Sequence, residues 1–146
     1  MPPWARFEYW RAPEKTAAAW RGDRVTVGDL GRVDDDGTVW LDGRREDLVI
    51  SGGVNVYPAE VEAVLDAHPD VVESAVFGVP DDEWGQRVVA AYVGAADPGD
   101  LGSWSRERLA PAKRPKTLHR LADLPRTSTG KVRRLDLPEA LGLDGA

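Results

Sequence analysis

The side chain best placed for chemistry is Lys131, which follows Gly130 in a polar segment, residues 124–134, that is rich in Thr and Ser. A lysine on such a loop can reach a phosphate as a mobile point charge, although a lysine considered alone is more often a solvated surface residue. Residues 111–146 carry eight basic and four acidic side chains, whereas residues 43–110 carry five and 13. This basic segment is either a surface that meets phosphates or a small anionic ligand, or a solvated face that balances the acidic middle of the chain.

Two other segments combine charge with glycine. Residues 43–47 are Gly-Arg-Arg-Glu-Asp and are soon followed by Ser51, Gly52 and Gly53. A charged run before a glycine pair suits a joint whose backbone can turn and let a ligand pass close, or simply a tight connection between a strand and a helix. Asp29 follows Gly28 where a short apolar run ends, and an aspartate in such a place is usually a turn residue.

Composition excludes several classes of protein and of site. The chain has 146 residues and no cysteine, which excludes a disulfide scaffold, a zinc ribbon and a thiol nucleophile. Its only two histidines, His68 and His119, are far apart, so we expect no metal site. An acidic pI of about 4.9 argues against a nucleic-acid partner, and the absence of a long apolar run argues against a membrane partner. We therefore expect a cytoplasmic protein.

The elements that must position these residues follow from local patterns. Pro13 and three alanines predict a first helix, Asp36-Gly37 predicts a hairpin turn, and Pro58 opens a helix whose apolar residues are spaced i, i+3, i+4. The spacing puts Val61, Val64 and Leu65 on one face of that helix, with Glu60 and Glu62 elsewhere. Ser103 is the expected N-cap of a later helix. The predicted helices span residues 12–20 and 103–109, and a third begins at residue 58. The strands span 24–27, 48–50, 71–79, 87–93 and 117–121; a hairpin spans 31–42; loops span 51–53 and 124–137.

From residue 43 onward these elements describe a compact α+β unit of about 100 residues, with helices against a small sheet. Residues 1–42 hold a helix and a hairpin, and neither can bury an apolar face by itself. They are typical of the trailing end of something larger.

Together, and in this order, the three segments resemble the C-terminal end of the adenylate-forming, or AMP-binding, enzymes. The resemblance covers residues 9–137. The sequence of residues 51–60, Ser-Gly-Gly-Val-Asn-Val-Tyr-Pro-Ala-Glu, is most similar to that of the acyl-CoA synthetases. It implies that residues 1–42 are the trailing edge of an N-terminal adenylation body and that residues 43–146 are a mobile C-terminal lid domain. The phosphate loop, the acyl pocket and a magnesium-binding glutamate belong to the body and are absent from this sequence.

The resemblance also implies roles for individual residues. Asp29 corresponds to an aspartate that binds the ribose hydroxyls of ATP and AMP, although Val27 stands where the family usually has Thr. Arg44 corresponds to an arginine near the ribose and phosphate of the nucleotide. Glu46 occupies the hinge position, where Asp or Lys is more usual. Lys131 corresponds to the lysine that stabilises charge during adenylation.

In the second half-reaction the resemblance implies that the lid rotates, so that Ser51, Gly52 and Gly53 line a tunnel for the pantetheine arm of CoA. The complete enzyme would use ATP, CoA and Mg, but none of them is expected to bind tightly to this chain alone, which should be inactive. Its partners would be the N-terminal adenylation body, in cis or in trans, and either CoA or a carrier-protein phosphopantetheine. The alternative is a non-catalytic interaction module that docks on an adenylation body or a carrier protein.

Overall fold

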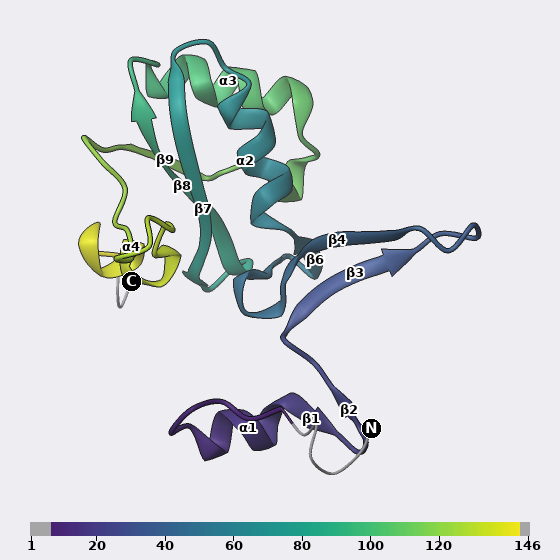
Figure 1. Ribbon diagram of the computed structural model, residues 1–146. Helices are drawn as coiled ribbons and strands as arrows, with labels where there is room; N and C mark the ends of the chain where they lie inside the picture. The colour runs from purple at the N-terminus through teal and green to yellow at the C-terminus, as the bar shows by residue number, and fades with distance from the viewer. Residues whose placement is uncertain (1–6, 144–146) are drawn as a thin grey trace. The chain divides into compact units, whose positions relative to one another are not determined.

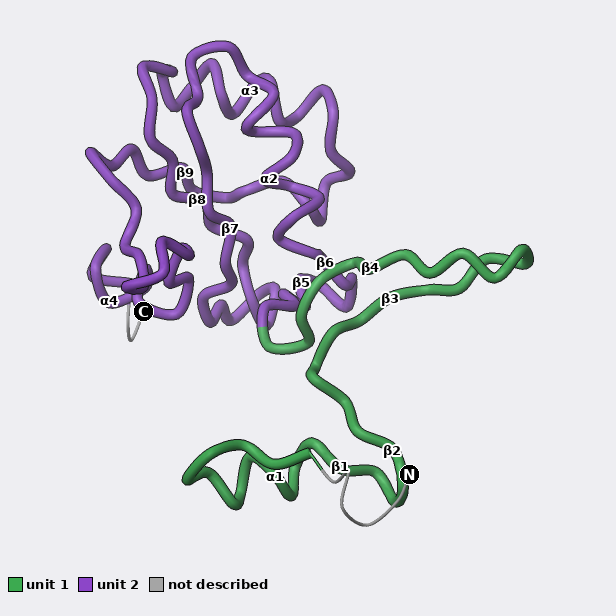
Figure 2. The backbone as a smooth tube through the Cα atoms, viewed as in Figure 1, with its two compact units in different colours: residues 1–46 green, residues 47–146 purple. Residues whose placement is uncertain are grey.

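The computed structural model describes residues 7–143. The chain divides into two compact units, residues 1–46 and 47–146 (Figure 2). Among the described residues, no helix is both long enough and apolar enough to span a membrane.

In its described residues, 7–46, the first unit contains one α-helix and two small antiparallel pairs of strands (Figure 1). The helix begins at a proline, as expected, and its three alanines are strong helix formers. Gly37 has a φ of +86° in the turn of the second pair, which confirms the Asp-Gly turn. The elements are α1 (Pro13–Ala19), β1 (Trp20–Arg21) with β2 (Arg24–Val25), and β3 (Asp29–Val33) with β4 (Val39–Arg44).

The second unit is built on a mixed five-stranded sheet that confirms the predicted α+β class. Strand β8 is central, because it pairs with β7 along one edge and with both β5 and β9 along the other. The pairing of β8 with β9 is parallel, and a helix connects them. Strand β6, absent from the sequence prediction, pairs with β5. The strands are β5 (Val49–Ser51), β6 (Val54–Val56), β7 (Val71–Asp81), β8 (Gly85–Gly94) and β9 (Thr117–Arg120).

Both faces of this sheet are covered, and the sequence of β8 is therefore a nearly continuous run of apolar residues. Val88, Ala90 and Tyr92 face a core shared with the two longer helices, whereas Val89 and Ala91 face a second core closed by the C-terminal segment. Figure 1 shows α2 and α3 together on one face of the sheet. The helical elements are α2 (Pro58–Asp66), α3 (Pro98–Arg108) and α4 (Leu137–Ala140), with short 3-10 turns η2 (Arg45–Asp47), η3 (Pro111–Lys113) and η4 (Arg134–Asp136).

Two local predictions in this unit were wrong. The helix expected at 103–109 begins five residues earlier, because the Asp97 carboxylate caps it by accepting from the backbone N–H of Gly99. Ser103 instead lies within the helix and donates to the carbonyl of Gly99. Glu62, assigned to the polar face of its helix, is buried with only 9% of its surface exposed.

Candidate functional site

In the first unit, the hairpin brings Asp29 and Arg44 together although they are 15 positions apart in the chain. The two residues are cross-strand partners in the β3–β4 register, and Arg44 Nε lies 3.5 Å from Asp29 Oδ1. Both side chains keep contact with solvent, with 36% of Asp29 and 55% of Arg44 exposed. The carboxylate therefore remains accessible to a ligand with paired hydroxyl groups, beside a guanidinium that suits a phosphate.

Glu46 ends the same unit and is highly exposed. Its carboxylate lies 3.5 Å from Arg44 Nη1, so Arg44 is shared between Asp29 and Glu46. An exposed pair of this kind contributes little to stability, which leaves the backbone at residue 46 weakly restrained by its side chain.

Residues 51–53, predicted as a loop, form a tight turn between β5 and β6 in the second unit. Ser51 pairs with Val54, so Gly52 and Gly53 are the two central residues of a hairpin turn, and both have positive φ, +57° and +79°. A Cβ on Gly52 would lie 3.0 Å from the ring of Trp84, whereas a Cβ on Gly53 would meet nothing within 4 Å. Ser51 is fully buried and its hydroxyl has no hydrogen-bond partner. The accessible part of the segment is thus the glycine pair.

Lys131 closes a tight turn of the C-terminal segment. Its carbonyl accepts from the N–H of Thr127 at 2.8 Å, its own N–H donates to Thr127 Oγ1 at 3.1 Å, and Gly130 has a φ of +83°. The side chain is exposed, and its ammonium group forms no ion pair with any residue that the structure describes. The backbone is therefore held in place while the charge is free to meet a ligand.

Sequence reasoning missed the two arginines that brace this turn. Arg126 donates to the carbonyl of Gly130 and pairs with Glu73 of β7, which raises the pKa of Arg126 above its ordinary value. Arg134 pairs with Glu62 of α2. Burial disfavours the Arg134 charge, but hydrogen bonds to Glu62 and the charges of Glu62 and Asp47 outweigh it, so the pKa of Arg134 is also raised.

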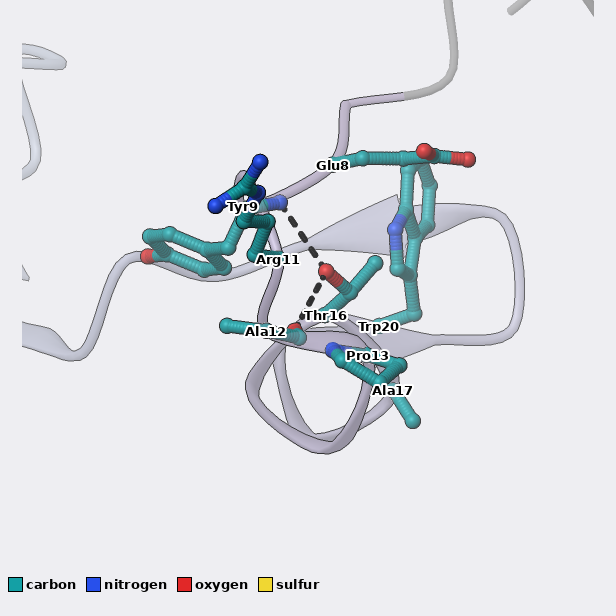
Figure 3. A pocket seen from close by; sticks show the side chains of 8 residues that line it. All are labelled: Glu8, Tyr9, Arg11, Ala12, Pro13, Thr16, Ala17 and Trp20. Carbon is teal, nitrogen blue, oxygen red and sulfur yellow. Dashed lines mark hydrogen bonds between the residues drawn. The ribbon is translucent and has the colours of Figure 1, made fainter.

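A pocket of about 470 Å³ lies elsewhere in the first unit, between Glu8 and Trp20 (Figure 3). Within it Thr16 accepts from the backbone N–H of Tyr9 and donates to the carbonyl of Ala12. The pocket contains none of the site residues predicted from the sequence. Among the described residues, no group of three His, Cys, Asp or Glu side chains could hold a metal ion.

Comparison with known proteins identifies the second unit. Residues 60–131 match the family described as AMP-binding enzyme C-terminal domain. The chain is 48% identical over 134 residues to 2-succinylbenzoate–CoA ligase of Geobacillus kaustophilus. The matched region covers 88% of this chain and 27% of that ligase. The chain corresponds to the C-terminal part of an adenylate-forming enzyme.

Two other relatives agree with this assignment. It is 39% identical to the fatty acid–[acyl-carrier-protein] ligase ScoC of Streptomyces coeruleorubidus, over 95% of this chain and 28% of that protein. The ATP-bound MatB of Rhodopseudomonas palustris superimposes with a TM-score of 0.83 at 43% identity, over 93% of this chain and 28% of MatB. The chain thus spans about a quarter of the length of the curated relatives it matches.

Proposed function

We propose that this chain supplies the mobile C-terminal part of a cytoplasmic ATP-dependent acid:CoA ligase. A carboxylate oxygen of the acid attacks the α-phosphorus of ATP, pyrophosphate leaves, and acyl-AMP forms. The CoA thiol, losing its proton, then attacks the acyl carbon, and AMP leaves with the bonding electron pair. The adenylation body, joined to this chain or separate from it, binds the acid and ATP and holds the magnesium ion.

Lys131 carries the proposal. Its ammonium is exposed and unpaired among the described residues, on a turn whose backbone is held by hydrogen bonds. In adenylation it bridges the carboxylate and α-phosphate oxygens and stabilises the charge that develops there. Removing one such preorganised contact costs about 10²–10³ in rate.

Asp29 and Arg44 contribute to nucleotide binding at the edge of the body. A carboxylate flanked by a guanidinium 3.5 Å away suits a ribose, whose adjacent hydroxyls donate to Asp29, and a nearby phosphate, which accepts from Arg44. The described residues therefore fit one side of ATP or AMP, whereas the β- and γ-phosphates need donors from the body.

The glycine turn serves the thiol step. With residue 46 as hinge, rotation of the C-terminal unit withdraws Lys131 and presents Gly52 and Gly53 to the pantetheine arm. The open space beside Gly53 and the positive φ of both glycines fit a wall without side chains. The acceptor is CoA or a carrier-protein phosphopantetheine, since both present the same arm.

The test uses a chimera in which this chain replaces the corresponding part of the G. kaustophilus ligase, with 2-succinylbenzoate as the acid. The chain alone and the chain mixed with the isolated body are measured beside it. We expect acyl-hydroxamate formation in the chimera, none from the chain alone, and a loss of about 10²–10³ in Lys131→Ala.

Arg133→Ala is the matched control, because it removes a positive charge two residues away whose partner is the partly exposed Asp136. It should retain the parent rate. An inactive parent chimera that folds and binds ATP, or full activity in Lys131→Ala, would contradict the proposal. Activity of the chain alone would contradict the division of labour between the body and this chain.

A further inference from the structure

The turn that carries Lys131 is continued by Arg134, and this arginine joins three separate parts of the second unit. It starts η4, three residues after the lysine. Its Nε and Nη2 donate to Glu62 Oε1 at 3.0 and 2.9 Å, and Nη2 also donates to Oε2 at 2.8 Å. Its Nη1 lies 3.9 Å from Asp47 Oδ2.

Glu62 ties this arginine to the frame of the unit. The carboxylate projects from α2, is nearly buried, and Oε1 also accepts the backbone N–H of Val76 at 2.8 Å. That N–H lies on the free edge of β7, which pairs only with β8 among the described strands. A helix on one face of the sheet, the sheet edge and the C-terminal segment thus converge on one carboxylate–guanidinium pair.

Asp47 gives the same guanidinium a second role. It is the first residue of the second unit and directly follows Glu46, the proposed hinge. Arg134 therefore contacts the start of the unit that would rotate and lies only three residues after Lys131 in the chain. Its neighbour Arg133 is more exposed, and its side chain pairs locally with Asp136 at 3.0 Å and with no other carboxylate in the described part of the chain.

We propose that Arg134 is a positioning residue for Lys131. By fixing the lysine turn to α2, to the edge of β7 and to the residue after the hinge, it makes the turn rotate with the unit as one body. This inference rests on the proposed function, because a fixed position of Lys131 matters only if the lysine enters an adenylation site.

The effect should be confined to one half-reaction. A displacement of about 1 Å at a reacting centre can cost about 10²-fold in rate, so Arg134→Ala should slow adenylation by about 10- to 100-fold. The thiol step does not use Lys131 and should keep its parent rate. A purely structural role would instead lower both half-reactions together.

The experiment compares Arg134→Ala, Arg133→Ala and Asp47→Asn in the chimera described above. Adenylation is followed by exchange of labelled pyrophosphate into ATP, and the thiol step by CoA acylation from supplied 2-succinylbenzoyl-adenylate. Hydrogen exchange of residues 124–134 is measured in this chain alone. We expect Arg134→Ala to lose adenylation selectively and to exchange faster in this segment, with Arg133→Ala matching the parent in all three measurements.

Asp47→Asn covers the case in which Arg134→Ala fails to fold, since it keeps the Glu62 pair and weakens only the contact next to the hinge. A smaller but still selective loss of adenylation supports the coupling to the hinge; a rate equal to the parent's overturns that coupling. Equal losses in both half-reactions, or full adenylation by a folded Arg134→Ala, overturn the positioning role. If Lys131→Ala is fully active, the proposed function itself fails, whatever Arg134 does to hydrogen exchange.

Discussion

The two units differ sharply in how they bury apolar surface. In the second, two buried clusters cover both faces of a sheet, and Leu65, Tyr92 and Leu101 are fully enclosed. In the described part of the first, Ala19 is the one buried apolar residue, whereas Trp40 and Leu41 of its hairpin are about half and three quarters exposed. The second unit therefore has the interior of an independent domain, and the first has apolar faces typical of a segment that packs on a larger partner.

The largest effect should come from truncating matched leucines in the two units. Leu101→Ala leaves a cavity in a closed core and should lower the free energy of unfolding by about 2–5 kcal/mol. Leu41→Ala removes a side chain that is 73% exposed and should change it by less than about 0.5 kcal/mol. Urea unfolding followed by circular dichroism measures both free energies. Similar losses of stability in the two variants would contradict the difference in apolar burial between the units.

Two glycines, one in each unit, lie close to a backbone carbonyl oxygen and allow a second comparison of the units. A Cβ on Gly94 would lie 2.2 Å from the carbonyl oxygen of Asp70, and a Cβ on Gly31 would lie 2.2 Å from that of Trp40. Gly94 also has a φ of +150°. Gly94→Ala should destabilise the second unit by more than about 1 kcal/mol.

Gly31→Ala should instead open the β3–β4 hairpin and leave the unfolding temperature of the second unit unchanged. Thermal unfolding of this chain measures the first effect. Amide exchange of the hairpin in the chimera, where we expect the parent hairpin to be protected, measures the second. A Gly31→Ala chain whose main transition falls as far as that of Gly94→Ala would show that the units unfold together.

The smallest effect concerns two aspartates with opposite pKa shifts. Partial burial of the Asp66 carboxylate raises its pKa, despite a hydrogen bond from Ser74, whereas hydrogen bonds from Thr38 lower the pKa of the exposed Asp36. The stability due to Asp66 is complete below its ordinary pKa of 3.8 and is lost as pH rises through the raised value. That due to Asp36 is present above 3.8 and is lost as pH falls through the lowered value.

Asp66→Asn should therefore stabilise the second unit at pH 7, by less than about 1 kcal/mol because the side chain remains in contact with solvent. Carboxyl titration by NMR should give a midpoint above 3.8 for Asp66 and below 3.8 for Asp36. Reversed midpoints, or a loss of stability in Asp66→Asn at pH 7, would contradict this assignment.

Local patterns predicted much of the fold because they act over a few residues. Pro58 with its apolar spacing located α2, and Asp36-Gly37 located the hairpin turn. Glu62 was misassigned because its burial depends on a partner 72 positions away, Arg134. A hint was available: Val61, Glu62 and Leu65 follow Pro58 at i+3, i+4 and i+7, which is the spacing of one buried helical face.

In the candidate site, too, local motifs identified some residues, whereas contacts between distant residues could not be predicted. Asp29 and Arg44 could be named from their motifs, but their 3.5 Å approach depends on the hairpin register and on an irregularity between Leu30 and Gly31. The braces of the lysine turn, Arg126 and Arg134, could not be inferred, because an arginine in a basic segment gives no sign of the distant carboxylate that it meets.

The most direct test of the difference between the units is amide hydrogen exchange, measured in this chain alone and in the chimera with an adenylation body. Strands β7 and β8 should be protected in both. Strands β3 and β4 should exchange rapidly in the chain alone, because an isolated hairpin is marginally stable, and become protected in the chimera. A hairpin that is already protected in the chain alone, or that stays unprotected in the chimera, would contradict the assignment of the first unit to the edge of the body.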